Sequence, residues 1–126
     1  MKKALVVDDS RAIRTMLSRI LVRYGFEVAQ AGDGSEALVV LEQHHGDFDL
    51  LCVDYNMPVM NGLELLSEMR EQPRFDDIPI MMVTTETQID FITSALALGA
   101  NEYVMKPFTD VMVLEKLQTL GLVPYE

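Results

Sequence analysis

Short apolar runs alternate along the chain with longer stretches in which hydrophobic residues recur at helical spacing. Residues 4–7 form a continuous apolar run, and residues 50–53 and 80–83 repeat the pattern. Unbroken apolar runs of this length are typical of strands that are covered on both faces. We therefore predict strands at residues 4–7, 27–31, 50–53, 80–83 and 102–105.

The stretches between these runs have the period of helices. After Ser10, a residue type that favours helix starts, apolar residues occupy one helical face, and Gly25 follows as a stop signal. The residues of this face are Ile13, Met16, Leu17, Ile20 and Leu21. The basic residues off this face, which we expect in solvent, are Arg11, Arg14, Arg19 and Arg23. Comparable patterns predict further helices through residues 37–41, 63–69, 87–98 and 110–120.

Predicted strands and helices thus alternate along the whole chain. Because crossovers between parallel strands are right-handed and pack back on the sheet, this order predicts a doubly wound α/β fold. Its core is a five-stranded parallel sheet with helices on both faces. The chain has 126 residues, an ordinary size for one unit of this kind, so we expect a single domain over residues 1–126.

Charge narrows the classes of partner. The chain has 20 acidic and 10 basic side chains, which gives a formal net charge of −10. A field of this sign repels phosphate backbones and anionic lipid, so we expect no direct binding to nucleic acid or to membranes. From Ile78 onward the only basic residues are Lys106 and Lys116. A cation this scarce in acidic surroundings suggests a specific task.

Two features indicate the compartment. The first apolar run stops at Asp8, which makes it far shorter than a signal-peptide core or than the ~20 residues that span a bilayer. Cys52 is the only cysteine and lies within an apolar run, so we expect a buried thiol and no internal disulfide. Both features favour a cytoplasmic protein.

Polar residues follow the predicted strands at the points where these end. Asp8 and Asp9 follow the first strand, Asp54 the third, Thr84 ends the fourth, and Lys106 follows the fifth. The carboxyl ends of parallel strands share one edge of the sheet, where ligands of such folds bind. Three carboxylates at one edge repel one another unless a cation lies between them. We therefore expect a site there rather than unrelated loop residues.

The ligand types favour a hard cation. Carboxylates without nearby histidine or cysteine suit Mg²⁺, Mn²⁺ or Ca²⁺ rather than Zn²⁺. Mg²⁺ commonly completes its shell with water and a phosphate oxygen, and Lys106 and Thr84 can hold further phosphate oxygens. These parts describe phosphoryl transfer, in which one carboxylate can itself be the nucleophile. The spacing alone does not say which carboxylate.

The same residues resemble a known family. The Asp8-Asp9 pair, the segment 54–62, Thr84 and the segment 103–107, in this order, are similar to the receiver domain of response regulators. The likeness runs from about Lys3 to Leu120, and the full set of motifs in register is specific. The resemblance implies a flavodoxin-like (βα)5 fold with strand order 2-1-3-4-5.

The resemblance also implies a role for each site residue. Asp54 matches the phosphoacceptor. Asp9, supported by Asp8, matches the site for Mg²⁺ or Mn²⁺, which Asp54 and the backbone carbonyl of Asn56 complete. Lys106 matches the lysine that contacts the phosphoryl group.

Two further residues match the family's switch. Thr84 corresponds to the hydroxyl residue that moves toward the phosphoryl group, and Tyr103 to the aromatic residue that turns inward when it does. The implied output face is the fourth helix, the fifth strand and the fifth helix. The bond from Lys106 to Pro107 is implied to be cis.

The implied function is a switch and not an enzyme that acts on other molecules. The protein takes a phosphoryl group from a histidine kinase and hydrolyses it autocatalytically. The residues 56–58, Glu86 and 99–103 resemble the single-domain chemotaxis type, which binds a flagellar-motor or similar target as a monomer.

Three alternatives stay open. The chain can be a phosphorelay shuttle or phosphate sink that works with a phosphotransfer protein, or the receiver of a longer regulator. It can also be a metal-dependent phosphatase or phosphotransferase. Such enzymes carry a second carboxylate two residues after the nucleophile, and Asn56 at this position disfavours that class.

Overall fold

The computed structural model describes residues 1–125 and contains one parallel sheet with helices between successive strands. The strands are β1 (Lys2–Val7), β2 (Phe26–Ala31), β3 (Leu50–Val53), β4 (Ile80–Thr84) and β5 (Glu102–Met105). The helices are α1 (Arg11–Arg23), α2 (Gly34–Gln43), α3 (Gly62–Arg70), α4 (Ile89–Ala97) and α5 (Asp110–Thr119). The strand order is β2-β1-β3-β4-β5, as the family resemblance implies.

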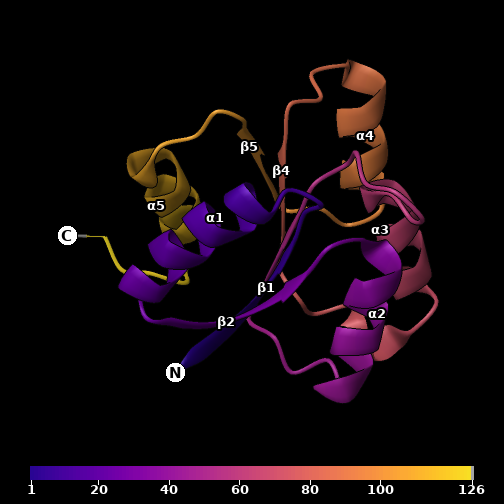
Figure 1. Cartoon of the computed structure of the whole chain (residues 1–126), viewed down its shortest axis with the longest axis horizontal. Coiled ribbons are helices and arrows are strands. Elements are labelled where there is room, and N and C mark those ends of the chain that lie inside the picture. The colour runs from indigo at the N-terminus through magenta and orange to yellow at the C-terminus, as the bar shows by residue number, and fades with distance from the viewer. Residues whose placement is uncertain (126) are drawn as a thin grey trace.

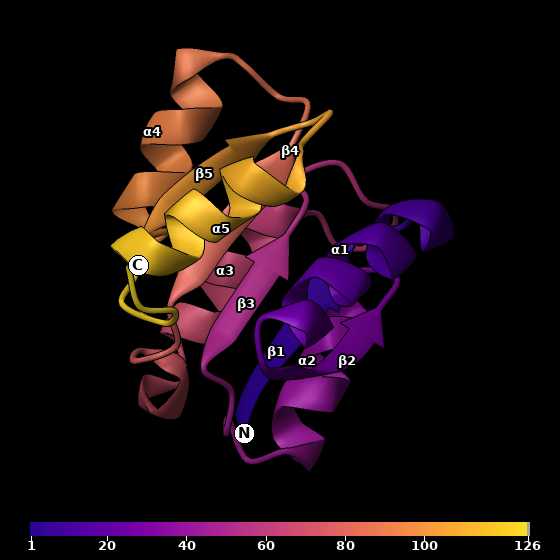
Figure 2. The same ribbon diagram turned by 90° about the vertical axis from the view of Figure 1, so that its left-hand side faces the viewer.

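The helices form two layers, one on each face of the sheet (Figures 1 and 2). Helices α1 and α5 cover one face, and α2, α3 and α4 cover the other. Alternate residues of β1 contact different layers, since Leu5 packs on the side of α2 and α3 whereas Val6 packs on the side of α1 and α5. Burial on both faces explains the unbroken apolar runs in the sequence.

The register of the strands aligns the ends that carry the polar residues. Val7 pairs with Val53, so the residues that follow them, Asp8 and Asp54, leave adjacent strands at the same level. At the other side of the sheet, Thr84 pairs with Met105, which places Lys106 one residue beyond the end of β5. Neighbouring strands thus deliver these side chains to one edge.

Side chains define where most helices begin. Ser10, Asp33, Asn61 and Thr109 each accept a hydrogen bond from a backbone N–H of the helix that follows, as N-caps do. Helix α4 has no such cap and begins two residues later than its apolar pattern predicts.

The late start of α4 in the sequence has a local cause. The backbone N–H of Gln88 donates to Glu86 Oε1, and that of Glu86 donates to Thr84 Oγ1. These side-chain acceptors stabilise a turn before the helix, and this turn replaces the first helical hydrogen bonds.

Two smaller expectations can be compared with the structure, which also contains one element that the sequence did not predict. The peptide bond between Lys106 and Pro107 is cis, as predicted. A short 3-10 helix at Pro73–Phe75 was not predicted. Cys52 is buried, also as predicted, and burial raises the pKa of its thiol. Within residues 1–125, no helix combines the length and the apolar character needed to cross a bilayer.

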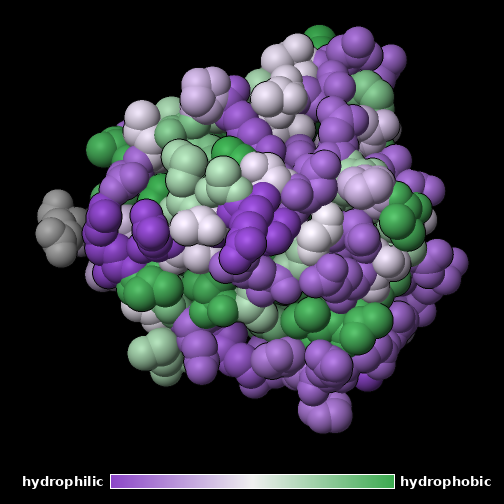
Figure 3. Space-filling view, in the orientation of Figure 1, coloured by the Kyte–Doolittle hydropathy of each residue, from purple (hydrophilic) through white to green (hydrophobic). Residues whose placement is uncertain are grey.

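The arginines of α1 do not all behave alike. The most hydrophilic colour in Figure 3 gathers over α1, the helix that carries four arginines. Arg11, Arg19 and Arg23 are exposed, as expected. The prediction is wrong for Arg14, which is half-buried and whose guanidinium donates to Gln30 Oε1 and to the backbone oxygen of Asp8.

Candidate functional site

Three carboxylates meet at the carboxyl edge of the sheet. Asp8, Asp9 and Asp54 each offer one oxygen, and these oxygens all lie within 4.8 Å of one another. Asp8 and Asp54 are only 2% and 7% exposed, whereas Asp9 is exposed. The backbone N–H of Asp54 donates to Val7 O at 3.0 Å, which ties the end of β3 to the end of β1. The convergence expected from the sequence is present.

Lys106 bridges two of these carboxylates. Its Nζ donates to Asp8 Oδ2 at 2.7 Å and to Asp54 Oδ2 at 3.2 Å, and its side chain is largely buried. Three carboxylates and one ammonium leave the cluster with a formal charge of −2. A divalent cation would balance this charge.

The pKa values of Asp8 and Lys106 are shifted by burial and by the charged groups around them. Burial raises the pKa of Asp8, and the charge of Asp54 adds to this rise, although hydrogen bonds from Lys106 and Ser10 oppose it. Burial by itself lowers the pKa of Lys106, but its hydrogen bond to Asp8 and the charge of Asp54 outweigh that effect, so the pKa ends above its usual value. Lys106 therefore stays charged beside the carboxylates.

The donors fit a hard divalent cation. The metal-ligating side chains of the cluster are all carboxylates, which suit Mg²⁺ and do not favour Zn²⁺. Asn56, whose backbone carbonyl is the remaining predicted ligand, lines the same open hollow of about 460 Å³ as Asp9. Tyr55, Met57, Pro58 and Asn61 also line this hollow. It offers room for water or a phosphate group beside the Asp9 carboxylate.

A glycine lets the loop after β3 close tightly over this edge. A Cβ at Gly62 would lie 2.3 Å from the backbone oxygen of Asp54, so no other residue fits. The Gly62 N–H donates to Tyr55 O at 2.9 Å. The bond between Gly62 and Tyr55 therefore closes the loop that carries Asn56, and the end of this loop packs against the backbone of Asp54.

The two predicted switch residues share one partner. Thr84 is fully buried, and its Oγ1 accepts from the Glu86 N–H at 3.2 Å. The Tyr103 hydroxyl donates to Glu86 O at 2.7 Å. Burial raises the pKa of Tyr103, with smaller contributions from the charges of Glu86 and Asp54. Both residues thus hold the segment that leads from β4 into α4.

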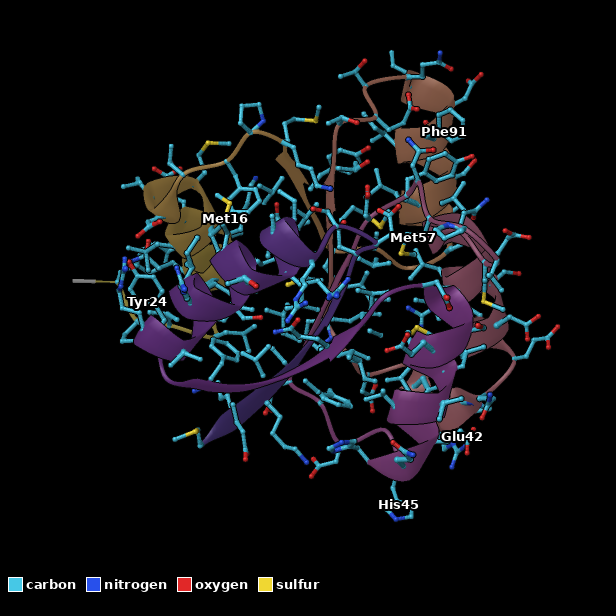
Figure 4. All side chains as sticks on the ribbon, in the orientation of Figure 1. Met16, Tyr24, Glu42, His45, Met57 and Phe91 are labelled. Atoms are coloured by element: carbon cyan, nitrogen blue, oxygen red, sulfur yellow. The ribbon has the colours of Figure 1, made fainter. Side chains whose placement is uncertain are left out.

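An aromatic contact that was not predicted also reaches α4. Tyr55, directly after Asp54, places its ring 4.3 Å from the Phe91 ring, centroid to centroid, at an interplanar angle of 48°. Phe91 lies on α4, above the loop that carries Met57 (Figure 4). The periodicity of a single helix does not show which loop residue its aromatic side chain meets.

With this geometry described, the class of protein can be stated. The sequence matches the family described as "Response regulator receiver domain" over residues 4–118. The chain belongs to this family, whose members are signalling domains and not enzymes in the ordinary sense.

Relatives and solved structures agree with this assignment. The chain is 43% identical to chemotaxis protein CheY1 of Helicobacter pylori over 119 residues, which covers 94% of this chain and 95% of that protein. It is 41% identical to chemotaxis protein CheY of Pseudomonas aeruginosa, with 94% of each chain covered. The structure is also similar to that of chemotaxis protein CheY4 of Vibrio cholerae, with a TM-score of 0.88 and 41% identity over 95% of this chain and 98% of the other.

Proposed function

We propose that this chain is a chemotaxis-type response regulator that accepts a phosphoryl group on Asp54 from a histidine kinase and then binds a protein target. The observation that best supports this is the pairing of Lys106 Nζ with both Asp8 and Asp54 beside a cluster of three carboxylates. Similarity to CheY proteins over nearly the whole chain supports the chemotaxis role.

Asp54 is the nucleophile in this proposal. One of its carboxylate oxygens attacks the phosphorus of a phosphohistidine, the P–N bond breaks, and the departing imidazole nitrogen keeps the electron pair. Asp54 suits this task because it directly follows β3, is paired with Lys106, and is succeeded by Tyr55 and Asn56, which line an open hollow. Hydrolysis is the corresponding attack by water, which releases inorganic phosphate and restores the carboxylate.

Asp8, Asp9, Asp54 and the Asn56 carbonyl are the residues that would hold Mg²⁺ or Mn²⁺. When bound, the cation neutralises charge on the phosphoryl oxygens. A crystal structure of a CheY from Borrelia burgdorferi in complex with CheX contains BeF3 and Mg²⁺ and has a TM-score of 0.87 and 26% identity to this chain. It covers 95% of this chain and 89% of the other, and it supports the same combination here.

Lys106 and Thr84 bind the incoming oxygens. A phosphoryl group on Asp54 carries about two negative charges in place of the single charge of the carboxylate, and it adds strong acceptor oxygens. Lys106, now 3.2 Å from Asp54 Oδ2, can pair with such an oxygen, and the Thr84 hydroxyl can donate to another.

The switch follows from the partner that Thr84 and Tyr103 share. When Thr84 turns toward the phosphoryl group, the Glu86 N–H loses its acceptor, and the segment that Tyr103 holds is released. Shifting a minor state from about 1% to 99% requires about 5.5 kcal/mol, which is within reach of a few charge-assisted hydrogen bonds. The output face is α4, β5 and α5, and its target is a flagellar-motor or similar protein that a cytoplasmic monomer can reach.

One alternative keeps support from the comparisons. Two similar structures belong to a histidine kinase receiver of Syntrophus aciditrophicus, at 27% identity, and to a response regulator/GGDEF domain protein, at 29%. The chain covers only 49% of the latter. A phosphorelay shuttle, or a receiver that serves a longer regulator, would use the same residues with another output.

The experiment is an intact-mass measurement after incubation with acetyl phosphate and MgCl2. We expect one phosphate adduct in the wild-type chain, and none after chelation with EDTA or in Asp54→Ala. Asp47→Ala is the control, because Asp47 is an exposed aspartate away from the cluster. An adduct that persists in Asp54→Ala, or none in the wild type, would contradict the proposal.

A further inference from the structure

The backbone oxygen of Asp8 has a partner outside the cluster. Arg14, on α1, donates from Nη1 to this oxygen at 2.7 Å. The oxygen belongs to the peptide group that joins Asp8 to Asp9. Because a peptide group is planar, holding its oxygen also sets the direction in which the chain enters Asp9.

Asp9 depends on its backbone for orientation more than Asp8 does. The Asp8 carboxylate is buried and accepts from Lys106 Nζ and from the Ser10 N–H. Asp9 is exposed, and within residues 1–125 its carboxylate has no hydrogen bond or ion pair. The hydrogen bond from Arg14 to the preceding peptide group therefore constrains Asp9, whose own side chain makes no bond that would hold it in place.

Arg14 is itself held in place. Its Nε donates to Gln30 Oε1 at 3.2 Å, and Gln30 Nε2 donates to the Oγ of buried Ser18, also at 3.2 Å. This chain of bonds runs from α1 to β2 and back to the segment between β1 and α1. Across the described residues, no carboxylate lies within 4.0 Å of the Arg14 guanidinium, so its fixed fork of donors serves geometry and not an ion pair.

Charge and geometry predict opposite effects of removing the Arg14 side chain on Mg²⁺ affinity. A positive charge beside a cation site repels the cation, so electrostatics alone predicts that its removal strengthens Mg²⁺ binding. If Arg14 orients the ligand, its removal weakens Mg²⁺ binding instead. Groups that orient metal ligands from outside the first coordination sphere typically change affinity about 10–100-fold.

We propose that Arg14 is a positioning residue for the metal site, which acts by fixing the peptide between Asp8 and Asp9 so that the Asp9 carboxylate faces Asp54. This inference rests on the proposed function, since it assigns a further residue to the same site.

The test is calorimetric titration of MgCl2 into the full chain after EDTA treatment. We expect Arg14→Met to raise the Mg²⁺ dissociation constant about 10-fold or more. Arg14→Lys should recover part of the affinity, because an ammonium can still donate to the Asp8 oxygen. Gln30→Leu should weaken binding less than Arg14→Met does, because it removes only the support of Arg14. Arg11→Met, the control, should leave the constant within twofold of wild type, because Arg11 is exposed and has the same charge on the same helix.

A second measurement does not depend on metal. In the metal-free chain, Arg14→Met should shift the amide NMR signal of Asp9, whereas Arg19→Met, at an exposed position further along the same helix, should not. With the mutant, adduct formation from acetyl phosphate should return to the wild-type rate at saturating Mg²⁺, which a general loss of structure would not allow.

Three results would overturn the proposal. One is an Arg14→Met chain that binds Mg²⁺ as tightly as the wild type or more tightly. Another is an equal loss in Arg11→Met, which would assign the effect to charge. The third is an unchanged Asp9 amide signal in metal-free Arg14→Met. Failure of the wild-type chain to bind Mg²⁺ would instead overturn the proposed metal site, and it is distinguished from the other results by the metal-free spectra.

Discussion

Helices α3 and α4 have nine residues each and pack on the same face of the sheet, yet the fold holds them differently. Helix α3 begins with a reciprocal capping box between Asn61 and Glu64 and buries Leu65, Leu66 and Met69. Helix α4 begins without a side-chain cap and, among its residues, buries only Ala95. Burial in the core fixes α3, whereas α4 depends on a few contacts.

Two of the contacts that hold α4 come from segments beside the acidic cluster. Tyr55, next to Asp54, packs against Phe91, and Tyr103 holds Glu86 just before the helix. A third contact lies at the far end, where Arg70 Nε donates to Leu98 O at 2.7 Å. A helix with little buried surface can move without unfolding the core, so the contacts near the site can set its position.

The largest expected effect comes from comparing a buried leucine of α3 with an exposed leucine of α4. Leu66→Ala in α3 should lower the free energy of unfolding by about 2–5 kcal/mol, because it leaves a cavity in the core. Leu96→Ala in α4 should change it by no more than about 0.5 kcal/mol, because Leu96 is 55% exposed. Urea unfolding of both variants measures the difference, and equal losses would show that α4 is anchored as firmly as α3.

The aromatic contact comes next in size. Phe91→Ala should lower the free energy of unfolding by about 1.5 kcal/mol or less, since Phe91 is only partly buried and the ring pair adds a modest term. Hydrogen exchange should accelerate in α4 but not in α3. Ile89→Ala is the control, because Ile89 is 77% exposed at the start of the same helix. If exchange in α4 were unchanged in Phe91→Ala, the contact with Tyr55 would not anchor the helix.

The helix caps provide a smaller contrast. Asn61→Ala should cost about 1 kcal/mol of stability, because it removes the acceptor for the Glu64 N–H at the start of α3. Gln88→Ala should be close to neutral, since the Gln88 side chain makes no capping bond. Chemical denaturation of the two variants under identical conditions checks this, and a loss in Gln88→Ala as large as in Asn61→Ala would contradict it.

The smallest effect concerns the bond from Tyr103. The pKa of the Tyr103 hydroxyl is raised in the folded chain above the ordinary value of about 10. Just above pH 10, the unfolded chain therefore loses the hydroxyl proton while the folded chain keeps it. The corresponding stability is therefore present below pH 10 and is lost as pH rises through the folded pKa. In Tyr103→Phe this component should be absent. Unfolding measured at several pH values above 9 compares the two chains, and identical pH dependence would contradict the assignment.

Much of the fold follows from the sequence because burial on both faces leaves a plain signal. The runs at residues 4–7, 50–53 and 80–83 lie within observed strands, and alternation with helices leads directly to a parallel sheet. The start of α4 was less predictable, because side-chain bonds at Glu86 and Thr84 compete with the first turn. Periodicity contains no information about such competition.

The site was predictable to the level of which residues converge. Asp8, Asp54 and Lys106 directly follow adjacent or nearby strands, and strand topology alone brings them together. The finer contacts were not predictable. That Lys106 lies closer to Asp8 than to Asp54, and that Arg14 reaches the Asp8 oxygen, depend on side-chain paths between elements.

The central claim is that phosphorylation of Asp54 acts on α4 through Thr84, and hydrogen exchange in the presence of acetyl phosphate and MgCl2 tests it most directly. We expect exchange to change in the segment from Glu86 through α4 while α3 stays as it was. The same treatment should leave α4 unchanged in Asp54→Ala, and in Thr84→Ala the phosphate adduct should form with a much smaller change in α4. An adduct on Asp54 with no change in α4, or the same change in Asp54→Ala, would contradict the account.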